Sequence, residues 1–552
     1  MRLMPLTCVL LAAALLSACG KPEPSPRNAL GNAPKAAAAE HANAASGAHK
    51  ADGIAWRHAL NEADVDASFA LARSQDKPVF VYWGAAWCPP CNQLKATLFN
   101  RQDFIARSKA FVAVYIDGDS PGAQKLGARF KVRGYPTTVL FNAQGAEMTR
   151  LPGEVDAAQY TQVLTLSMNA QRPVKAVLAD ARAGGKGLSG NDWRLLAFYS
   201  WETDEQQAIA KAELPAVLAQ LAAACPTDQV EASTRLLLKA VAATPKDAKD
   251  SKAAKADSAV PAALDRVLQL LGNAPEARAQ MDVLGNNAAE LVRALSALAT
   301  PERAKLLAAF DGALRTLQAD TTLSRADRLT ALYARVELVR IDAPKDSAVA
   351  LPAAFLTELN EHVARADREI VDGYERQAVI PFAGYVLQQA GLLDESDALL
   401  QANLAKSHSP YYLMSELASN AKKRGDKSGA LSWSERAFDA SVGPATRLQW
   451  GASYIGALVE LAPQDEQRIE KAALKVLDEA AAQPDVFYER SARSLQRVGT
   501  RLVAWNKDGA HAAVVKRLQS RVDTLCAALP TGDAQRATCE GLLKPAPTKG
   551  DA

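Results

Sequence analysis

The sequence predicts a multidomain protein, in which an α/β domain at residues 53–170 is followed by a large all-α region of solenoid-like helical repeats at residues 171–545. A chain of 552 residues exceeds one ordinary hydrophobic core. Between residues 54 and 168, β-rich runs alternate with helical ones, which is typical of an α/β unit. Beyond that point alanine, leucine and charged residues follow helical spacing, and strand-like runs are nearly absent.

The first residues predict a leader and an anchor. Residues 1–18 contain an apolar core, Leu3–Leu16, that is too short to span a bilayer, and they end in small residues directly before Cys19. This pattern resembles the lipobox of bacterial lipoproteins, which implies that Cys19 becomes the lipidated first residue of an exported protein. In that family an aspartate at the position of Gly20 signals retention in the inner membrane, so glycine favours the outer membrane. An ordinary cleaved signal peptide is the alternative.

Residues 19–52 are expected to form a disordered tether that carries the lipidated cysteine. They are rich in proline, alanine, asparagine and glycine, and they hold too few bulky apolar residues to offset the entropy of ordering. A flexible chain of this length spans ~30 Å on average. Export to the periplasm also means that disulfides can form and persist.

The α/β domain is built from short runs whose order can be followed along the chain. Apolar, β-branched and aromatic residues mark strands, and proline or glycine marks their ends. We expect these elements in order: a helix from about Trp56 to Lys77, a strand at Val79–Trp83, a helix after the cysteine motif, a short helix within Thr97–Ala110, a strand at Phe111–Asp117, a helix at Pro121–Phe130, strands at Thr137–Phe141 and Ala146–Leu151, and a helix at Asp156–Met168.

The motif that carries chemistry is Cys88-Pro89-Pro90-Cys91, between the first predicted strand and a helix. Cys88 is predicted at the helix N-terminus, where free N–H groups and the helix dipole stabilise a thiolate. The prolines fit there because first-turn N–H groups have no intrahelical partner. A structural disulfide and a zinc site are the alternatives; the first would close a very short loop, and the second needs four ligands that the domain does not offer at suitable spacing.

A second motif, Gly134–Thr137, follows 43 residues after Cys91 at the start of a strand. The two motifs together resemble the thioredoxin family, and more narrowly the periplasmic domain of DsbD-type interchange proteins, over about a fifth of the chain. The resemblance implies a redox dithiol in which Cys88 is the nucleophile, nearer solvent, and Cys91 resolves the mixed disulfide. It also implies a cis bond before Pro136, with Tyr135 and the surface ring of Trp87 contacting the substrate.

Two positions depart from the thioredoxin pattern. Tyr82 stands where the family often buries an acid, so proton transfer to Cys91 is expected to use solvent or Tyr82 itself. Asn92 stands where a lysine is common, which removes one positive charge near the dithiol.

In the helical region, Gly391 and Gly425 are 34 residues apart, as are Pro410 and Pro444. Residues 411–444, and less regularly residues from 379, resemble tetratricopeptide repeats, so we expect such repeats at about 379–444. The charged insert at residues 246–257 is interpreted as a solvated loop.

The end of the chain offers one more cysteine pair. Cys526 and Cys539 flank a turn between two helical runs, and we expect a structural disulfide that closes a loop of ~14 residues and stabilises by ~3 kcal/mol. Two free thiols are the alternative. Residues 546–552 are expected to be a disordered tail.

We therefore expect a membrane-anchored periplasmic thiol-disulfide oxidoreductase that acts on protein thiols or disulfides, in the reductive direction. The net charge of +3 argues against a nucleic-acid binder, and no pattern for a metal or cofactor is present in the sequence. Its other partners would be an electron donor or acceptor, a protein bound by the helical region, and the membrane through the lipid. The alternative is an interaction scaffold or redox sensor without turnover.

Overall fold

The computed structural model describes residues 53–153, 155–201, 203–204, 208–244, 259–343 and 350–544. The predicted leader, Cys19, the tether, the charged insert and the tail lie outside the described residues. The described residues from Ile54 onward form one compact unit. The predicted fold class is confirmed, because a mixed α/β sheet domain is followed by a large all-helical region.

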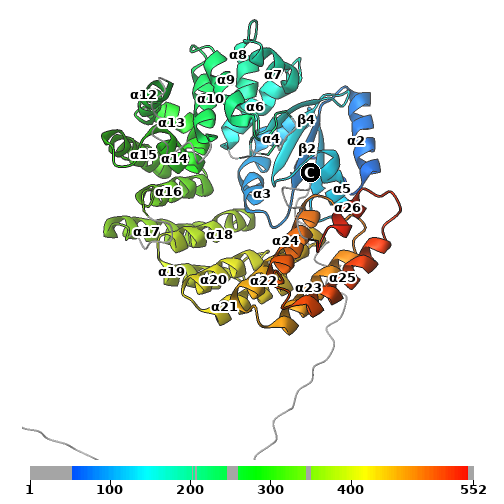
Figure 1. Ribbon diagram of the computed structural model, residues 1–552. Coiled ribbons are helices and arrows are strands. Elements are labelled where there is room, and N and C mark those ends of the chain that lie inside the picture. Colours follow the sequence, from blue (N-terminus) through cyan, green and yellow to red (C-terminus); the bar gives the residue numbers. More distant parts are fainter. Residues whose placement is uncertain are drawn as a thin grey trace, which may run out of the picture. The chain divides into compact units, whose positions relative to one another are not determined.

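In the described part of the chain, five strands form one sheet in the order β1-β3-β2-β4-β5 (Figure 1). The first three in this order are mutually parallel, whereas β4 is antiparallel to β2 and to β5. The strands are β1 (Arg57–His58), β2 (Val79–Gly84), β3 (Val112–Asp117), β4 (Thr137–Phe141) and β5 (Glu147–Leu151).

The helix expected from Trp56 begins later, so that part of the prediction is wrong. Arg57 and His58 instead form the short edge strand β1, which pairs with β3. The helix starts after Asn61, whose side chain accepts the N–H of Asp64 and so caps it. The helices of the domain are α2 (Glu62–Gln75), α3 (Pro89–Leu94), the π-helical turn η1 (Lys95–Phe99), α4 (Gln102–Ser108), α5 (Ala123–Arg129) and α6 (Ala157–Met168).

The central strand β2 is buried on both faces, and its side chains alternate between two cores. Val81 and Trp83 pack into a core that includes side chains of α2 and α5. Phe80 and Tyr82 point to the opposite face, where their core also contains the motif cysteines and continues into the helical region. The dithiol side of the sheet and the helical region therefore share one hydrophobic core.

The helical region is made of amphipathic helices that pack against their neighbours. Positive φ angles at Gly391 and Gly425 end α18 and α20, which gives the 34-residue spacing a physical meaning. The helices are α7 (Val174–Arg182), α8 (Gly190–Ala197), α9 (Leu214–Ala224), α10 (Val230–Ala242), α12 (Ala259–Leu271), α13 (Ala274–Ala279), α14 (Met281–Leu295), α15 (Pro301–Ala319), α16 (Arg325–Val339), α17 (Ala353–Glu369), α18 (Gly373–Gln389), α19 (Leu393–Asn403), α20 (Tyr411–Lys423), α21 (Lys427–Ala440), α22 (Pro444–Leu461), α23 (Glu466–Ala481), α24 (Glu489–Trp505), α25 (Ala512–Ala527) and α26 (Gln535–Glu540).

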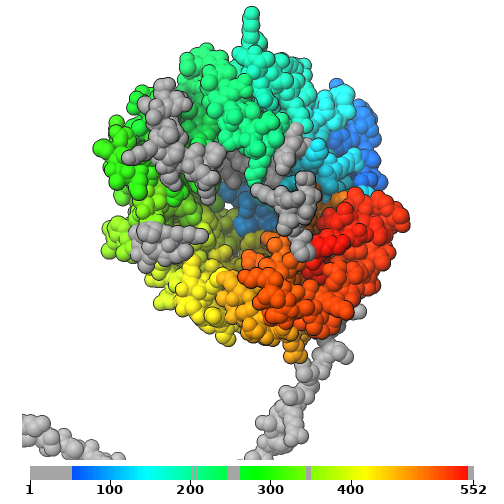
Figure 2. Space-filling view, in the orientation of Figure 1, coloured from blue at the N-terminus to red at the C-terminus, as the bar shows by residue number. Residues whose placement is uncertain are grey.

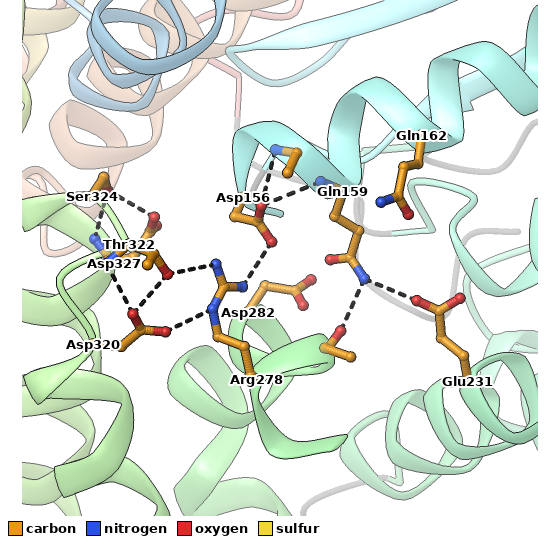
Figure 3. A network of polar contacts seen from close by, with 12 residues as sticks. Asp156, Gln159, Gln162, Glu231, Arg278, Asp282, Asp320, Thr322, Ser324 and Asp327 are labelled. Carbon is orange, nitrogen blue, oxygen red and sulfur yellow. Dashed lines mark hydrogen bonds and ion pairs between the residues drawn. The ribbon is translucent and has the colours of Figure 1, made fainter. Parts of the chain in front are cut away.

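The helical region contacts the α/β domain at several places along its length. Figure 1 shows its later helices returning to the domain, with α18 packed on α3 and α24 packed on α5. A polar network supplies another tie (Figure 3): Arg278 donates to Asp156 at the start of α6 and to Asp320 after α15, both at 2.9 Å. Gln159 of α6 adds a bond to the carbonyl of Ala279 at 3.0 Å. The position of the helical region over α3 is thus fixed from several sides.

Candidate functional site: an enclosed dithiol

The cysteine motif forms the first turn of α3. Cys88 is the N-cap residue, and its sulfur accepts the N–H of Cys91 at 3.1 Å. Pro89 and Pro90 occupy the first two helical positions, where no N–H is required. The two sulfurs are joined in a disulfide, with a Cα–Cα distance of 5.2 Å. This is the oxidised form of a pair that can accept two electrons.

Asn92, in the place of the common lysine, locks the turn that precedes the helix. Its amide donates to the carbonyls of Ala86 and Cys88, both at 2.8 Å. The side chain is fully buried, so it takes a structural part in holding the motif.

The second motif lies beside the first. The Tyr135–Pro136 peptide bond is cis, and Thr137 opens β4 directly after it. The ring centroids of Tyr135 and Trp87 are 5.3 Å apart. The fold therefore brings together the two motifs that the sequence separates by 43 residues.

Trp87, expected on the surface, is buried at 7% exposure. Its ring lies nearly parallel to that of Tyr412 from α20, with centroids 5.7 Å apart, and the guanidinium of Arg490 from α24 lies 4.1 Å from its centre. Its carbonyl accepts the side-chain amide of Gln377 from α18 at 3.3 Å. The surface expectation is wrong because three helices from the far end of the chain cover this ring.

Asp119, in the loop after β3, joins the domain to the covering helix α24 and to its neighbour α22. Its carboxylate accepts the indole N–H of Trp87, and it accepts the backbone N–H and hydroxyl of Thr446 at 2.8 and 2.6 Å. Arg490 lies 3.6 Å from the same carboxylate and donates to Gln449 at 2.8 Å. Sequence reasoning missed these residues, since no local motif links positions more than 300 apart.

The outer side of α3 also contacts the helical region. The amide of Gln93 donates to Asp327 at 2.7 Å and to the hydroxyl of Ser324 at 3.3 Å. Burial raises the pKa of Asp327 to about 6, although these donors partly oppose the shift.

The two cysteines are enclosed as a result. Cys88 is 1% exposed and Cys91 is fully buried, so the expectation that Cys88 lies nearer solvent holds only in this relative sense. A sulfur with this exposure reaches the disulfide of a client only when the covering helices move.

The core that contains the dithiol also contains the buried hydroxyl of Tyr82, and a partly buried carboxyl lies on the strand beside it. The hydroxyl of Tyr82 is buried without a hydrogen-bond partner in the described residues, and burial, followed by the charge of Asp117, raises the pKa of this phenol far above its ordinary value. Tyr82 is therefore a poor proton carrier near neutral pH. Asp117 pairs in register with Gly84, and burial raises its pKa. This carboxyl lies on the neighbouring strand β3, where the family pattern at Tyr82 gives no sign of it.

Three further observations bear on the predicted sites. Cys526 and Cys539 are joined, with Cα atoms 5.7 Å apart, and they link α25 to α26. In the part of the chain that the structure describes, no helix is both long and apolar enough to cross a membrane. Within the same residues, histidine, cysteine, aspartate and glutamate form no group of three that could hold a metal ion.

Comparisons with known proteins match the α/β domain. A family model described as a thioredoxin-like domain matches residues 65–166. The thiol:disulfide interchange protein DsbD 1 of Pseudomonas aeruginosa is 31% identical over 107 residues, which are 19% of this chain and 18% of that protein. A thioredoxin-like protein of Synechocystis is 35% identical over 99 residues, which are 18% of this chain and 90% of that protein.

Among solved structures, a DsbH oxidoreductase is 18% identical, covers 22% of this chain and 88% of its own, and has a TM-score of 0.19. The chain spans about a fifth of the length of the DsbD proteins that it matches.

Proposed function

This chain belongs to the thioredoxin-like family, and we propose that it is a thiol-disulfide oxidoreductase that exchanges disulfides with protein cysteines through Cys88 and Cys91. The observation that carries the proposal is the position of Cys88 at the N-terminus of α3, with its sulfur bonded to Cys91 and the cis Tyr135–Pro136 loop beside it. Helix N-termini stabilise thiolates, and the thiolate is the attacking species.

The reductive direction requires two steps. The thiolate of Cys88 attacks a client disulfide, which forms a mixed disulfide and releases one client thiolate. The thiolate of Cys91 then attacks the sulfur of Cys88, which releases the second client thiolate and leaves the Cys88–Cys91 disulfide. Two electrons pass from the protein to the client, and a thiol donor must restore the dithiol.

We place this activity in the periplasm, with a lipid on Cys19 holding the protein at the outer membrane. The lipobox-like pattern before Cys19 and the absence of an aspartate at residue 20 support this location. The helical region, with tetratricopeptide-like hairpins at about 379–444, would orient a protein partner. The helical region also contacts α3 and Trp87, which gives it a second role: it controls which molecules reach Cys88.

Replacement of the resolving cysteine tests the reaction. In Cys91→Ser the second step is blocked, so mixed disulfides through Cys88 should accumulate in cells and appear as adducts on a non-reducing gel. The double variant Cys88→Ser/Cys91→Ser is the matched control and should form none. Equal recovery from the single and the double variant would refute the proposal.

The 1% exposure of Cys88 favours a second candidate, a redox sensor whose dithiol does not turn over. Reduction of insulin by dithiothreitol separates the two. A turnover enzyme raises the rate above background in a manner that depends on Cys88, whereas a sensor leaves the rate unchanged.

A further inference from the structure

A cavity of about 430 Å³ lies between α3 and five helices of the helical region, α14, α15, α16, α18 and α20. Figure 2 shows the molecule hollowed here, with blue atoms of the early chain at the base of the hollow. On the dithiol side the cavity is lined by Pro89 and Pro90 of the motif, and by Gly153. A Cβ on Gly153 would meet the ring of Pro136 at 3.3 Å, so this part of the lining lies next to the cis-proline loop.

The size of the cavity limits what can enter. Its volume lies within the range of small-ligand sites, ~300–1,000 Å³, and is far too small for the face of a folded protein. A peptide segment in extended conformation is the form of a protein client that fits such a space beside the dithiol.

The lining favours a positive charge. Among the described residues that form it there is no lysine or arginine. Aromatic rings of Phe382, Tyr385 and Tyr412 line it, and rings of this kind attract cations through their faces. Three carboxyl groups, which belong to Asp282, Asp327 and Glu416, complete the lining.

Two of these carboxylates already have partners. Asp282 receives two hydrogen bonds from Arg235, at 2.9 and 2.5 Å, and Asp327 accepts from Gln93 and Ser324. In the described part of the chain, only burial and the charge of Lys423 act on Glu416, with no hydrogen bond to its carboxyl.

The environment of Glu416 contains one nearby cation, Lys423 on the same helix, which acts through its charge. Burial is the larger effect and raises the pKa of Glu416 to about 7. A carboxylate that loses water without gaining a partner is available to a cation that enters the cavity.

We propose that this cavity receives the extended segment of a client that flanks its disulfide, and that Glu416 selects clients with lysine or arginine next to the cysteine. This inference rests on the proposed disulfide exchange. The α/β domain supplies the wall with the motif prolines and Gly153, and the helical region supplies the opposite wall with the selecting charge.

Synthetic peptides test the selection directly. The probes are acetyl-Xaa-Cys-Xaa-amide with Xaa as lysine, glutamine or glutamate, and with the cysteine joined to 2-thiopyridine as a disulfide. Full-length protein reduced with dithiothreitol and freed of it reduces this disulfide to the peptide thiol and 2-thiopyridone, while its own dithiol becomes the Cys88–Cys91 disulfide. The absorbance of the released thiopyridone gives the rate.

At pH 8 the lysine peptide should react about tenfold faster than the glutamate peptide, which corresponds to ~1.4 kcal/mol. In Glu416→Gln the ratio should fall to about one, the value without a selecting charge. Glu395→Gln is the matched control, because Glu395 is exposed on the neighbouring helix α19 and does not line the cavity, and it should keep the wild-type ratio.

Each other outcome overturns a distinct statement. An unchanged ratio in Glu416→Gln, or equal rates for all three peptides, refutes the selection and leaves the exchange reaction standing. Cystamine is a small dicationic disulfide, and its reaction is followed by formation of the Cys88–Cys91 disulfide. If cystamine oxidises the dithiol in a manner that depends on Glu416 but no peptide reacts, the occupant is a small molecule and the peptide assignment is wrong. If neither the peptides nor cystamine react, the proposed function itself fails.

Discussion

Replacement of Arg490 by alanine should open the cover over Cys88 without removing any atom of the dithiol. Arg490 belongs to α24, and its guanidinium lies on the ring of Trp87, the residue next to Cys88. It also donates to Gln449 at 2.8 Å and to Thr446 at 3.1 Å. The shortened side chain therefore loses its contacts with Trp87, Gln449 and Thr446, while the backbone bond from Arg490 to Gln124 stays.

The magnitude follows from the ion pair with Asp119. Both side chains are buried, at 8% and 12% exposure, and their charged atoms are 3.6 Å apart. Loss of one partner of a buried pair costs ~3–5 kcal/mol. Asp119 keeps its bonds from Thr446 and Trp87 in the variant, so the lower end applies. A change of ~3 kcal/mol makes the open state ~100-fold more populated.

Alkylation of the reduced full-length protein measures this opening. The protein is treated with dithiothreitol and then with iodoacetamide, and the modified Cys88 peptide is quantified by mass spectrometry against time. Arg490→Ala should raise the rate at Cys88 by ~100-fold if modification follows the population of the open state. Arg501→Ala, an exposed arginine on the same helix, is the control and should leave the rate unchanged.

The buried free thiol of Cys225 separates local opening from global unfolding, because it lies in the core after α9. In Arg490→Ala its alkylation should stay slow. A wild-type rate at Cys88 in this variant, or an equal acceleration at Cys225, would refute the view that Arg490 holds a local cover.

Two further predictions concern stability. The pKa of Asp327 lies near 6, above its ordinary 3.8, so at pH 5 the folded state holds a proton that the unfolded chain has released. The free energy of unfolding should therefore fall by up to ~3 kcal/mol as pH rises from about 4 to 7, relative to Asp327→Asn. Urea denaturation at each pH measures it, and the same pH dependence in both proteins would contradict this. Cys526→Ser/Cys539→Ser should cost ~3 kcal/mol by calorimetry without reductant, and an unchanged melting temperature would refute a stabilising role.

The thioredoxin-like domain was largely predictable because its signals are local. The continuous apolar run Val79–Trp83 marks a buried strand, and β2 occupies Val79–Gly84 with every residue buried. The predicted strand Thr137–Phe141 is β4, and Asp156 caps the predicted helix that begins at Ala157. The edge strand β1 was missed since two residues are too few to show an alternating pattern.

The enclosure of the dithiol could not be read from the same signals. Helical periodicity predicts the helices of residues 171–545 and their apolar faces, but a face that packs on the next helix and one that covers Trp87 have the same pattern. The contacts that place these helices over the dithiol join Asp119 to Thr446 and Gln124 to Arg490, across more than 300 residues. Such pairings follow from tertiary packing, and neither helix propensity nor residue spacing in the sequence predicts them.

The enclosure also changes what separates an oxidoreductase from a sensor. The reaction rate of a covered thiolate is the product of the open fraction and the intrinsic rate of the exposed thiolate, so each ~1.4 kcal/mol of opening free energy lowers it tenfold. A client that binds only the open state shifts this equilibrium by its differential affinity for the two states. Pro89 and Pro90 line the cavity but Cys88 does not, so a client bound in the cavity still depends on opening around Cys88. The two functions therefore differ in one measurable quantity, the free energy of opening over Cys88 in the presence and absence of a client.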